Sequence, residues 1–337
     1  MPRLTLAVIL IGTLLGQSAW AAEQFKFPTA NHALVDGGGE DKFLVGTPGK
    51  PPGTGGFGCV RSDGWQMHEG LDIRALTRDK RDEPTDPVLA TANGTVAYSS
   101  DKPGLSNYGR YVILRHQVEG LEIYSLYAHL SEIDPSIKPG KPVRAGDPVG
   151  VMGRSTNTRT PITKDRAHVH FELNLMLSDR FAQWHQKNAP EQRNDHGAFN
   201  GHNLVGIDPK SVFLQQKLLG DKFSLLAVIQ KEPELCRVLV RATAFSYVKK
   251  YAPLVVRNPV AEKEGVAGYE ISLDFNGVPI RLTPRAASEI KGGAKVQLLG
   301  VNEAEYKRNP CRKLVRQRNG KWELGHAGEQ LIDLLLF

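Results

Sequence analysis

The stretch DRAHVHFEL, at residues 165–173, decides how the rest of the chain is interpreted. Apolar and polar residues alternate along it, which is typical of a β-strand. Because side chains on a strand repeat every two residues, His168 and His170 are expected to project from the same face of a sheet. Two imidazoles side by side suit a metal site or an acid/base pair. Taken alone, the motif also fits an ordinary strand with two half-exposed histidines.

Three residues of matching chemistry precede this stretch. His68 and Asp72 lie in the segment MHEGLDI, where Gly70 disfavours a helix, so a turn that leads into a strand is expected. His129 ends another strand-like run, in the order Tyr-Ala-His-Leu. The chain therefore carries one carboxylate and four imidazoles in an ordered series that could converge on one site.

The chemistry of this series points to zinc. Imidazole nitrogens and carboxylate oxygens are ligands for Zn²⁺, and three protein ligands with a fourth position left for water are the pattern of a catalytic site. Bound zinc lowers the pKa of water toward ~7. Histidines outside the metal would then accept and donate protons. Spacing alone does not decide which of His168 and His170 is a ligand and which is a base.

Short strand-like runs, joined by turn residues, surround these motifs. An Asn-Gly pair within residues 88–98 predicts a hairpin, and residues 143–152 predict another one that turns at glycine. Residues 111–116 and 121–130 form a further pair, and residues 167–177 hold the histidine strand. This pattern predicts a mainly β protein built on an antiparallel β-sheet or small sandwich.

The elements that contain these five residues resemble those of a known family. The elements His68-x-x-x-Asp72, Tyr-Ala-His129-Leu and His168-x-His170-Phe-Glu are similar to those of the lysostaphin/LytM-type zinc endopeptidases, which cut peptide cross-links of bacterial peptidoglycan. The resemblance covers about residues 60–212 and implies the lysostaphin-type (duplicated-hybrid-motif-like) β fold.

The resemblance also implies a role for each residue of the series. His68, Asp72 and His170 would bind one Zn²⁺, while His129 and His168 would be the catalytic pair, with His168 preferred as the general base. Glu172 could orient a ligand or line the groove. The alternative is a non-catalytic cell-wall binding module or activator on the same fold. Such relatives lack zinc ligands, so the complete set of five residues counts against this alternative.

Two segments depart from the family pattern. Residues 154–166 are long and basic, and residues 178–206 look like an insertion with some helix. Both are expected to border the groove and to influence which substrate is preferred. Within the insertion, His185, His196 and His202 lack tight ligand spacing, so a second metal site there is not expected.

Composition and length suggest several segments in the 337-residue chain. The predicted organisation is a signal peptide at 1–21, an extended Gly/Pro-rich segment at 22–58, a zinc peptidase domain at 59–219 with the insertion 178–206, and a smaller β-rich domain of unknown role at 220–337.

The first residues predict export. An apolar run from Leu4 to Leu15 and the Ala-Trp-Ala sequence that ends at Ala21 match a cleavable signal peptide and are too short for a membrane anchor. A periplasmic or secreted protein without a membrane span is expected. Residues 22–58 could lie across the groove and keep the enzyme latent, in which case their deletion would raise activity.

Charge and cysteines add two expectations for the C-terminal part. Residues 220–337 contain 19 Lys and Arg against 13 Asp and Glu, and residues 307–321 hold seven basic residues and no acidic one. This surplus could contact an anionic cell-wall polymer, whereas nucleic acid is a poor fit for an exported chain without aromatic interleaving. Cys236 and Cys311 could form a disulfide worth ~4 kcal/mol, which leaves Cys59 as a small buried residue.

Overall fold

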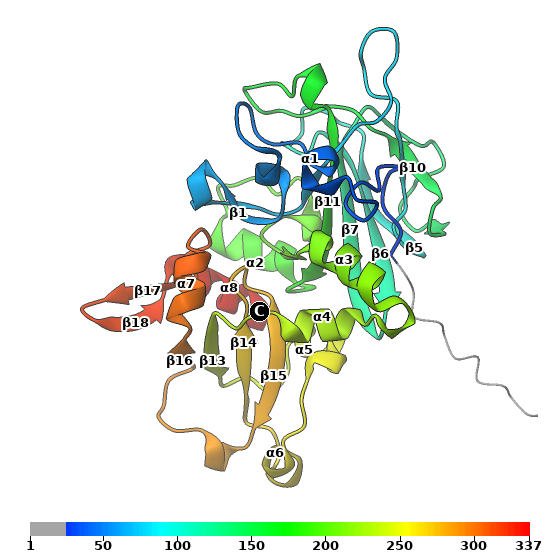
Figure 1. Cartoon of the computed structure of the whole chain (residues 1–337). Helices are drawn as coiled ribbons and strands as arrows, with labels where there is room; N and C mark the ends of the chain where they lie inside the picture. Colours follow the sequence, from blue (N-terminus) through cyan, green and yellow to red (C-terminus); the bar gives the residue numbers. More distant parts are fainter. Residues whose placement is uncertain (1–24) are drawn as a thin grey trace, which may run out of the picture.

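The computed structural model describes residues 25–337, so the predicted signal peptide at 1–21 lies outside the described residues. Most strands pair antiparallel, as the sequence predicted, and the mainly β fold class is confirmed. Figure 1 shows the central sheet in the upper part of the view and a second group of strands, drawn in orange and red, in the lower part.

A seven-stranded sheet carries the histidine strand. Its order is β12-β11-β7-β6-β5-β9, and β3 pairs with the other end of β11. The strand bounds are β3 Leu71–Arg74, β5 Gly94–Ser100, β6 Arg110–Val118, β7 Leu121–Leu130, β9 Pro142–Val143, β11 His168–Met176 and β12 Leu204–Ile207. Every residue of β11 is buried, so the histidine strand lies in the interior of the molecule.

The predicted pairing of residues 111–116 with residues 121–130 is confirmed as the β6–β7 hairpin. Glu119 and Gly120, between the two strands, have φ values of 51° and 77°. Two consecutive positive φ values are the geometry of the tight turn that matches the twist of paired strands. This hairpin places His129 near the end of β7, beside the histidine strand.

The other two predicted hairpins, at 88–98 and 143–152, are wrong. A separate sheet of order β4-β10-β8 contains Pro87–Leu89, Pro148–Val151 and Glu132–Ile133, whereas β5 and β9 belong to the large sheet. Gly94 was interpreted as a turn residue, but a Cβ there would lie 2.4 Å from the carbonyl oxygen of Arg115. The glycine allows close approach to β6, which is its other common use inside strands.

The segments that flank the seven-stranded sheet contain short helices. Residues 22–58, predicted as extended chain, include α1 Gly39–Phe43 and a 3₁₀ turn at Pro52–Gly55, and the two-stranded pair β1 Gly58–Arg61 and β2 Gln66–His68 follows. The insertion is partly helical, as predicted, with α2 at Phe181–Asn188. After β12 the chain forms α3 Pro209–Leu219, and the side chain of Asp208 caps this helix by accepting from the backbone N–H of Lys210.

The C-terminal part is built on a four-stranded sheet of order β15-β14-β13-β16. Its strands are β13 Cys236–Val240, β14 Gly268–Leu273, β15 Pro279–Arg285 and β16 Val296–Val301. Residues 252–255 form a 3₁₀ turn and a single bridge from Val255 to Leu282. Elements that were not predicted are α4 Leu225–Lys231, α5 Ser246–Lys250, α6 Pro259–Glu264, α7 Glu303–Arg308, β17 Val315–Arg318, β18 Lys321–Leu324 and α8 His326–Leu336.

One continuous apolar core runs through both parts of the chain. It includes Phe43 and Phe171 of the N-terminal part together with Ile271 and Leu335 of the C-terminal part. The domain boundaries predicted from the sequence stay a prediction. The shared core nevertheless means that the C-terminal part is packed against the sheet that carries the histidines.

The predicted Cys236–Cys311 disulfide is wrong. Cys59 and Cys311 form a disulfide, with 5.5 Å between their Cα atoms, and Cys236 is a free, buried thiol. Cys236 lies on β13, in the middle of the C-terminal sheet, where it packs as a small apolar residue. The disulfide therefore joins β1, beside the seven-stranded sheet, to the segment that follows α7.

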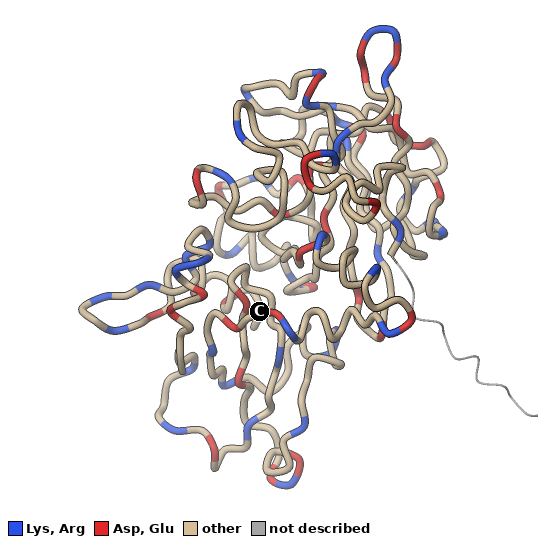
Figure 2. The backbone as a smooth tube through the Cα atoms, in the orientation of Figure 1, with Lys and Arg blue, Asp and Glu red and all other residues tan. Residues whose placement is uncertain are grey.

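The basic stretch at 307–321 runs from the end of α7 into the β17–β18 hairpin, which projects from the molecule and carries several Lys and Arg positions, coloured blue in Figure 2. Arg308 and Arg316 form ion pairs with Glu305 and Glu323, which neutralises part of the surplus. Contact with an anionic polymer stays a prediction. Within residues 25–337, no helix combines the length and apolar character needed to cross a bilayer.

Candidate metal centre

Strand pairing brings the predicted site residues together. β11 lies between β3 and β7, and in this register His170 stands opposite both Asp72 on β3 and Ala128 on β7. His68 ends β2, and His129 follows Ala128. The turn into a strand that Gly70 predicted is confirmed, because β2 ends at His68 and β3 begins at Leu71. All five candidate residues therefore lie around one end of β11.

Three ligand atoms form a tight triangle. Nε2 of His68 lies 3.1 Å from Oδ1 of Asp72 and 3.1 Å from Nδ1 of His170, and the last two atoms are 3.0 Å apart. These residues form the single group suited to hold a metal ion among the described residues. Ligands about 2.0–2.1 Å from a tetrahedral Zn²⁺ would be separated by roughly 3.3 Å. The donor set and its spacing therefore fit zinc.

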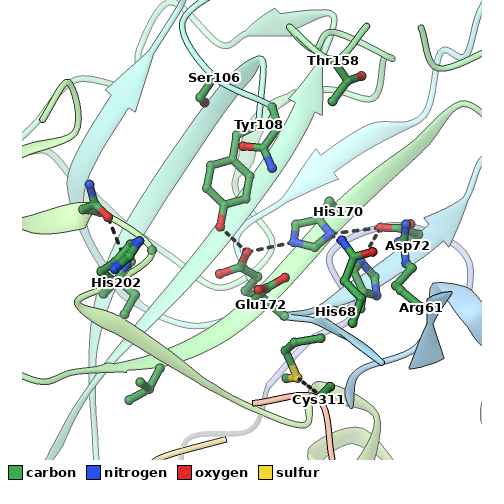
Figure 3. A pocket seen from close by; sticks show the side chains of 18 of the residues that line it. Arg61, His68, Asp72, Ser106, Tyr108, Thr158, His170, Glu172, His202 and Cys311 are labelled. Atoms are coloured by element: carbon green, nitrogen blue, oxygen red, sulfur yellow. Dashed lines mark hydrogen bonds and ion pairs between the residues drawn. The ribbon is translucent and has the colours of Figure 1, made fainter. Parts of the chain in front are cut away.

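Each histidine of this triangle has its second ring nitrogen fixed. Nδ1 of His68 donates to the carbonyl oxygen of Gly56 at 2.7 Å, and Nε2 of His170 donates to Oε1 of Glu172 at 2.8 Å. These hydrogen bonds select the tautomers that leave the facing nitrogens free, which is typical of metal-binding histidines. Glu172 accepts a hydrogen bond from Tyr108 at 2.8 Å (Figure 3). Asn174 donates to its other oxygen, also at 2.8 Å.

His129 and His168 lie beside the triangle and share one arrangement. Nδ1 of His129 donates to the carbonyl oxygen of Ser155 at 2.9 Å, and Nδ1 of His168 donates to that of Arg166 at 2.6 Å. Their ring centroids are 5.0 Å apart. His129 also has a φ of 63°, a conformation rare for residues other than glycine and frequent at functional sites. In both rings Nε2 faces the site, and that of His168 lies 3.4 Å from Oδ1 of Asp72.

The surroundings favour a charged carboxylate and a neutral His129. Burial would raise the pKa of Asp72, but the neighbouring imidazoles of His168 and His68 and hydrogen bonds from His168 and His170 hold this pKa well below its ordinary value. Burial lowers the pKa of His129 well below its ordinary value, and the charges of His168 and His170 lower it further. Asp72 thus presents an anionic oxygen to a cation.

Arg61 completes the environment of Asp72, and no pattern in the sequence predicted it. Its guanidinium donates to Oδ2 of Asp72 at 2.6 Å, which leaves Oδ1 to face the two histidines. Arg61 lies on β1, and no local spacing links it to Asp72. Glu172 could be found from the sequence, because it continues the two-residue repeat of His168 and His170.

The five residues open into a cavity of about 1130 Å³. The long basic segment at 154–166 and the insertion both contribute to its walls, as predicted, through residues such as Thr158 and His202. His202 and His196 line the cavity, but they do not join His185 in a metal-binding group among the described residues. His116 is a core histidine, since its ring contacts Asn93 and Ser125 inside the sheet.

The geometry defines a class: a buried His/Asp/His metal centre on an antiparallel sheet, with two adjacent histidines at the base of a groove. The model of peptidase family M23 matches residues 66–181, which include all five residues. Residues 66–181 are therefore similar to peptidase family M23, and the resemblance to the lysostaphin/LytM type that the sequence predicted is confirmed. No curated protein matches the chain.

Three solved structures are similar to the chain over part of its length. A glycyl-glycine endopeptidase lytM of Ruminococcus gnavus is 22% identical, covers 43% of this chain and 45% of its own, and has a TM-score of 0.28. A variant catalytic domain of the prophage-encoded M23 protein EnpA of Enterococcus faecalis is 24% identical. The match covers 39% of this chain and 79% of that one, with a TM-score of 0.27. The catalytic domain of the antimicrobial peptidase lysostaphin of Staphylococcus simulans is also 24% identical. That match covers 35% of this chain and 75% of the other, with a TM-score of 0.25. The chain thus spans less than half of the first of these proteins.

Proposed function

We propose that the chain is an exported zinc metalloendopeptidase that hydrolyses peptide cross-links of bacterial peptidoglycan. The observation that carries the proposal is the buried triangle of His68, Asp72 and His170, in which each imidazole has its second nitrogen held by a hydrogen bond. Export rests on the signal-like residues 1–21, and the substrate class rests on the matching family.

His68 Nε2, Asp72 Oδ1 and His170 Nδ1 would hold the zinc ion. When bound, Zn²⁺ supplies Lewis acidity and makes water a nucleophile near neutral pH. Glu172 and the carbonyl oxygen of Gly56 keep the ligand rings in place. Because these contacts already hold both rings in position, the ligands need little rearrangement when the metal binds.

His129 and His168 would move the protons. With each Nδ1–H donated to a backbone carbonyl, Nε2 is the atom that exchanges protons with water or substrate. One ring, His168 by the sequence prediction, accepts the proton of the attacking water. The protonated imidazole then donates to the carbonyl oxygen as it becomes anionic or to the departing amine. Their assigned roles stay a prediction.

Digestion of purified peptidoglycan sacculi tests the proposal. The mature chain loaded with zinc is expected to release peptides with cleaved cross-links, as read by mass spectrometry. His68→Ala should lose zinc and activity, whereas His168→Ala should retain zinc and lose activity. His326→Ala is the matched control, because His326 is exposed and lies outside the cavity. A chain that binds zinc but leaves sacculi and their released peptides intact would refute the proposed activity.

Zinc content also separates the peptidase from the alternative of a non-catalytic binding module. All five residues converge at the end of β11, so the chain retains what a binding module on this fold would lack. We expect one zinc ion per chain by elemental analysis. Binding to sacculi without zinc would favour the binding module.

A further inference from the structure

The cavity that contains the metal centre extends to the C-terminal part of the chain. Its walls include Cys311 and Arg312, and also one face of α8 through Ala327, Gln330 and Leu331. Figure 3 shows Cys311 at the same cavity as His68 and Glu172. The C-terminal part therefore forms a wall of the groove in which a substrate would lie.

Three bonds fix this wall against the peptidase sheet. The Cys59–Cys311 disulfide ties the residue next to Arg312 to β1. Nε1 of Trp184, on the insertion helix α2, donates to Oδ2 of Asp333 on α8 at 2.7 Å. Arg180 donates to the backbone oxygen of Phe337 at 2.9 Å. The wall is thus covalently and non-covalently fixed relative to the metal centre.

Arg312 is the unusual residue of this wall. Its buried Nε lacks a hydrogen-bond partner, a feature that it shares with Arg61 and Arg74 among the described residues. The other two arginines satisfy a different guanidinium nitrogen, on Asp72 and on the carbonyl oxygen of Leu44. Arg312 donates no hydrogen bond to any residue of 25–337. A permanently charged group that is partly buried without an acceptor is costly, so it indicates a site for an acceptor from outside the chain.

Arg312 is attracted by the carboxylates of Glu69 and Asp274 but is not in direct contact with either of them. No carboxylate of the described residues lies within ion-pair distance of it. Glu69 lines the same cavity, but its exposure to solvent screens its charge. Burial lowers the pKa of His202, and the nearby charge of Arg312 lowers it further. Thr158 and Gln330 add neutral polar groups to the walls.

We propose that Arg312 binds a carboxylate of the peptide substrate, so that the C-terminal part completes the groove and selects anionic peptides. A guanidinium offers two parallel donors that match a carboxylate, a geometry that favours Arg over Lys. This inference rests on the proposed peptidase function and names a substrate class for it: cross-linked peptides with a free carboxyl group near the bond that is cut.

A binding experiment with matched ligands tests the role of Arg312. The ligands are cross-linked disaccharide-peptide dimers, prepared from sacculi with a muramidase, with their carboxyl groups either free or converted to carboxamides. Zinc-loaded chain in a His168→Ala background is titrated with each ligand by calorimetry. We expect the free carboxyl form to bind about 10- to 100-fold more tightly. Equal affinity for the two forms would overturn the inference without any change at Arg312.

Substitutions then test whether Arg312 causes the preference for the ligand with free carboxyl groups. Arg312→Gln is expected to abolish it, Arg312→Lys to retain part of it, and Arg316→Gln to leave it intact, since Arg316 pairs with Glu323 away from the cavity. A preference that persists in Arg312→Gln would contradict the assignment. Cleavage is measured separately with the unmodified chain. Preferential binding without cleavage would refute the peptidase and keep the anion site, whereas cleavage of both ligand forms at equal rates would refute the anion site alone.

Discussion

Glu172 Oε1 lies 2.8 Å from Nε2 of His170, and both residues project from the same face of β11. The same carboxylate oxygen accepts a hydrogen bond from Tyr108, and the other accepts one from Asn174. Burial would raise the pKa of Glu172, but hydrogen bonds from His170, Asn174 and Tyr108 and the charge of His170 lower it. A charged carboxylate therefore holds the imidazole with Nδ1 turned toward Asp72.

Replacing this carboxylate should weaken metal binding without removing a ligand. Glu172→Gln keeps an acceptor but loses the negative charge, so we expect zinc affinity to fall about 10- to 100-fold. Competition with a chromophoric chelator measures the dissociation constant. Glu323→Gln, a change at a half-buried position of β18 outside the cavity, serves as the control and should leave the affinity unaltered. If Glu172→Gln binds zinc as tightly as the parent chain, the carboxylate has no influence on the ligand.

Short-range pattern was enough to find the metal centre but not its surroundings. The two-residue repeat of β11 placed His168, His170 and Glu172 on one face, because strand geometry fixes side-chain direction locally. Arg61 reaches Asp72 from a different strand, and Arg312 reaches the cavity from the far end of the chain. Such neighbours depend on tertiary packing, which spacing in one segment does not encode.

The errors in the predicted fold also arise from neighbours that are distant in the sequence. Gly94 follows Asn93, the strongest hairpin signal in the chain, yet its missing side chain serves close approach to β6, and the flanking strands enter different sheets. The disulfide partner was also mistaken, because nearness in sequence suggested Cys236 for Cys311. Cys59, 252 residues away, is its neighbour in space.

Reduction of the Cys59–Cys311 disulfide should destabilise the protein strongly. The bond closes a loop with a sequence separation of 252 residues, for which the chain-entropy description gives about 5 kcal/mol of stabilisation. Denaturant unfolding of a Cys59→Ser/Cys311→Ser variant, compared with the parent chain, measures the loss. The Cys236→Ala variant keeps the disulfide and should retain sensitivity to reductant. Identical stability with and without the bond would contradict the proposed role of this tether.

The segment at 22–58 should act as part of the fold rather than as a removable inhibitor. Phe43 is fully buried in the core, and the carbonyl oxygen of Gly56 holds His68. We expect Phe43→Ala to cost about 3–5 kcal/mol of unfolding free energy. Lys50→Ala, an exposed change in the same segment, should stay within about 0.5 kcal/mol. Deletion of the segment is expected to reduce stability and zinc binding, whereas a stable deletion variant with raised activity would restore the latency hypothesis.

Asp274 should make the protein less stable as pH rises toward neutral. Burial raises the pKa of this carboxyl to about 7, and the charge of Glu232 raises it, although backbone N–H groups of residues 276–278 oppose the shift. In the unfolded chain an aspartate has a pKa of about 3.9, so the native state holds its proton more tightly. The resulting stabilisation is complete below about pH 4 and is lost as pH rises through about 7.

The Asp274→Asn variant tests this assignment. Asn retains the oxygen that accepts from the backbone of Asn276 and Val278, at 2.9 and 2.8 Å, but it does not titrate. Its unfolding free energy should therefore fall less between pH 4 and pH 8 than that of the parent chain, by an amount on the order of 1–3 kcal/mol. Denaturant unfolding across this pH range gives the slope. Asp221→Asn, at an exposed position, should reproduce the parent slope. A parent-like slope in Asp274→Asn would show that the carboxyl titrates normally in the folded protein.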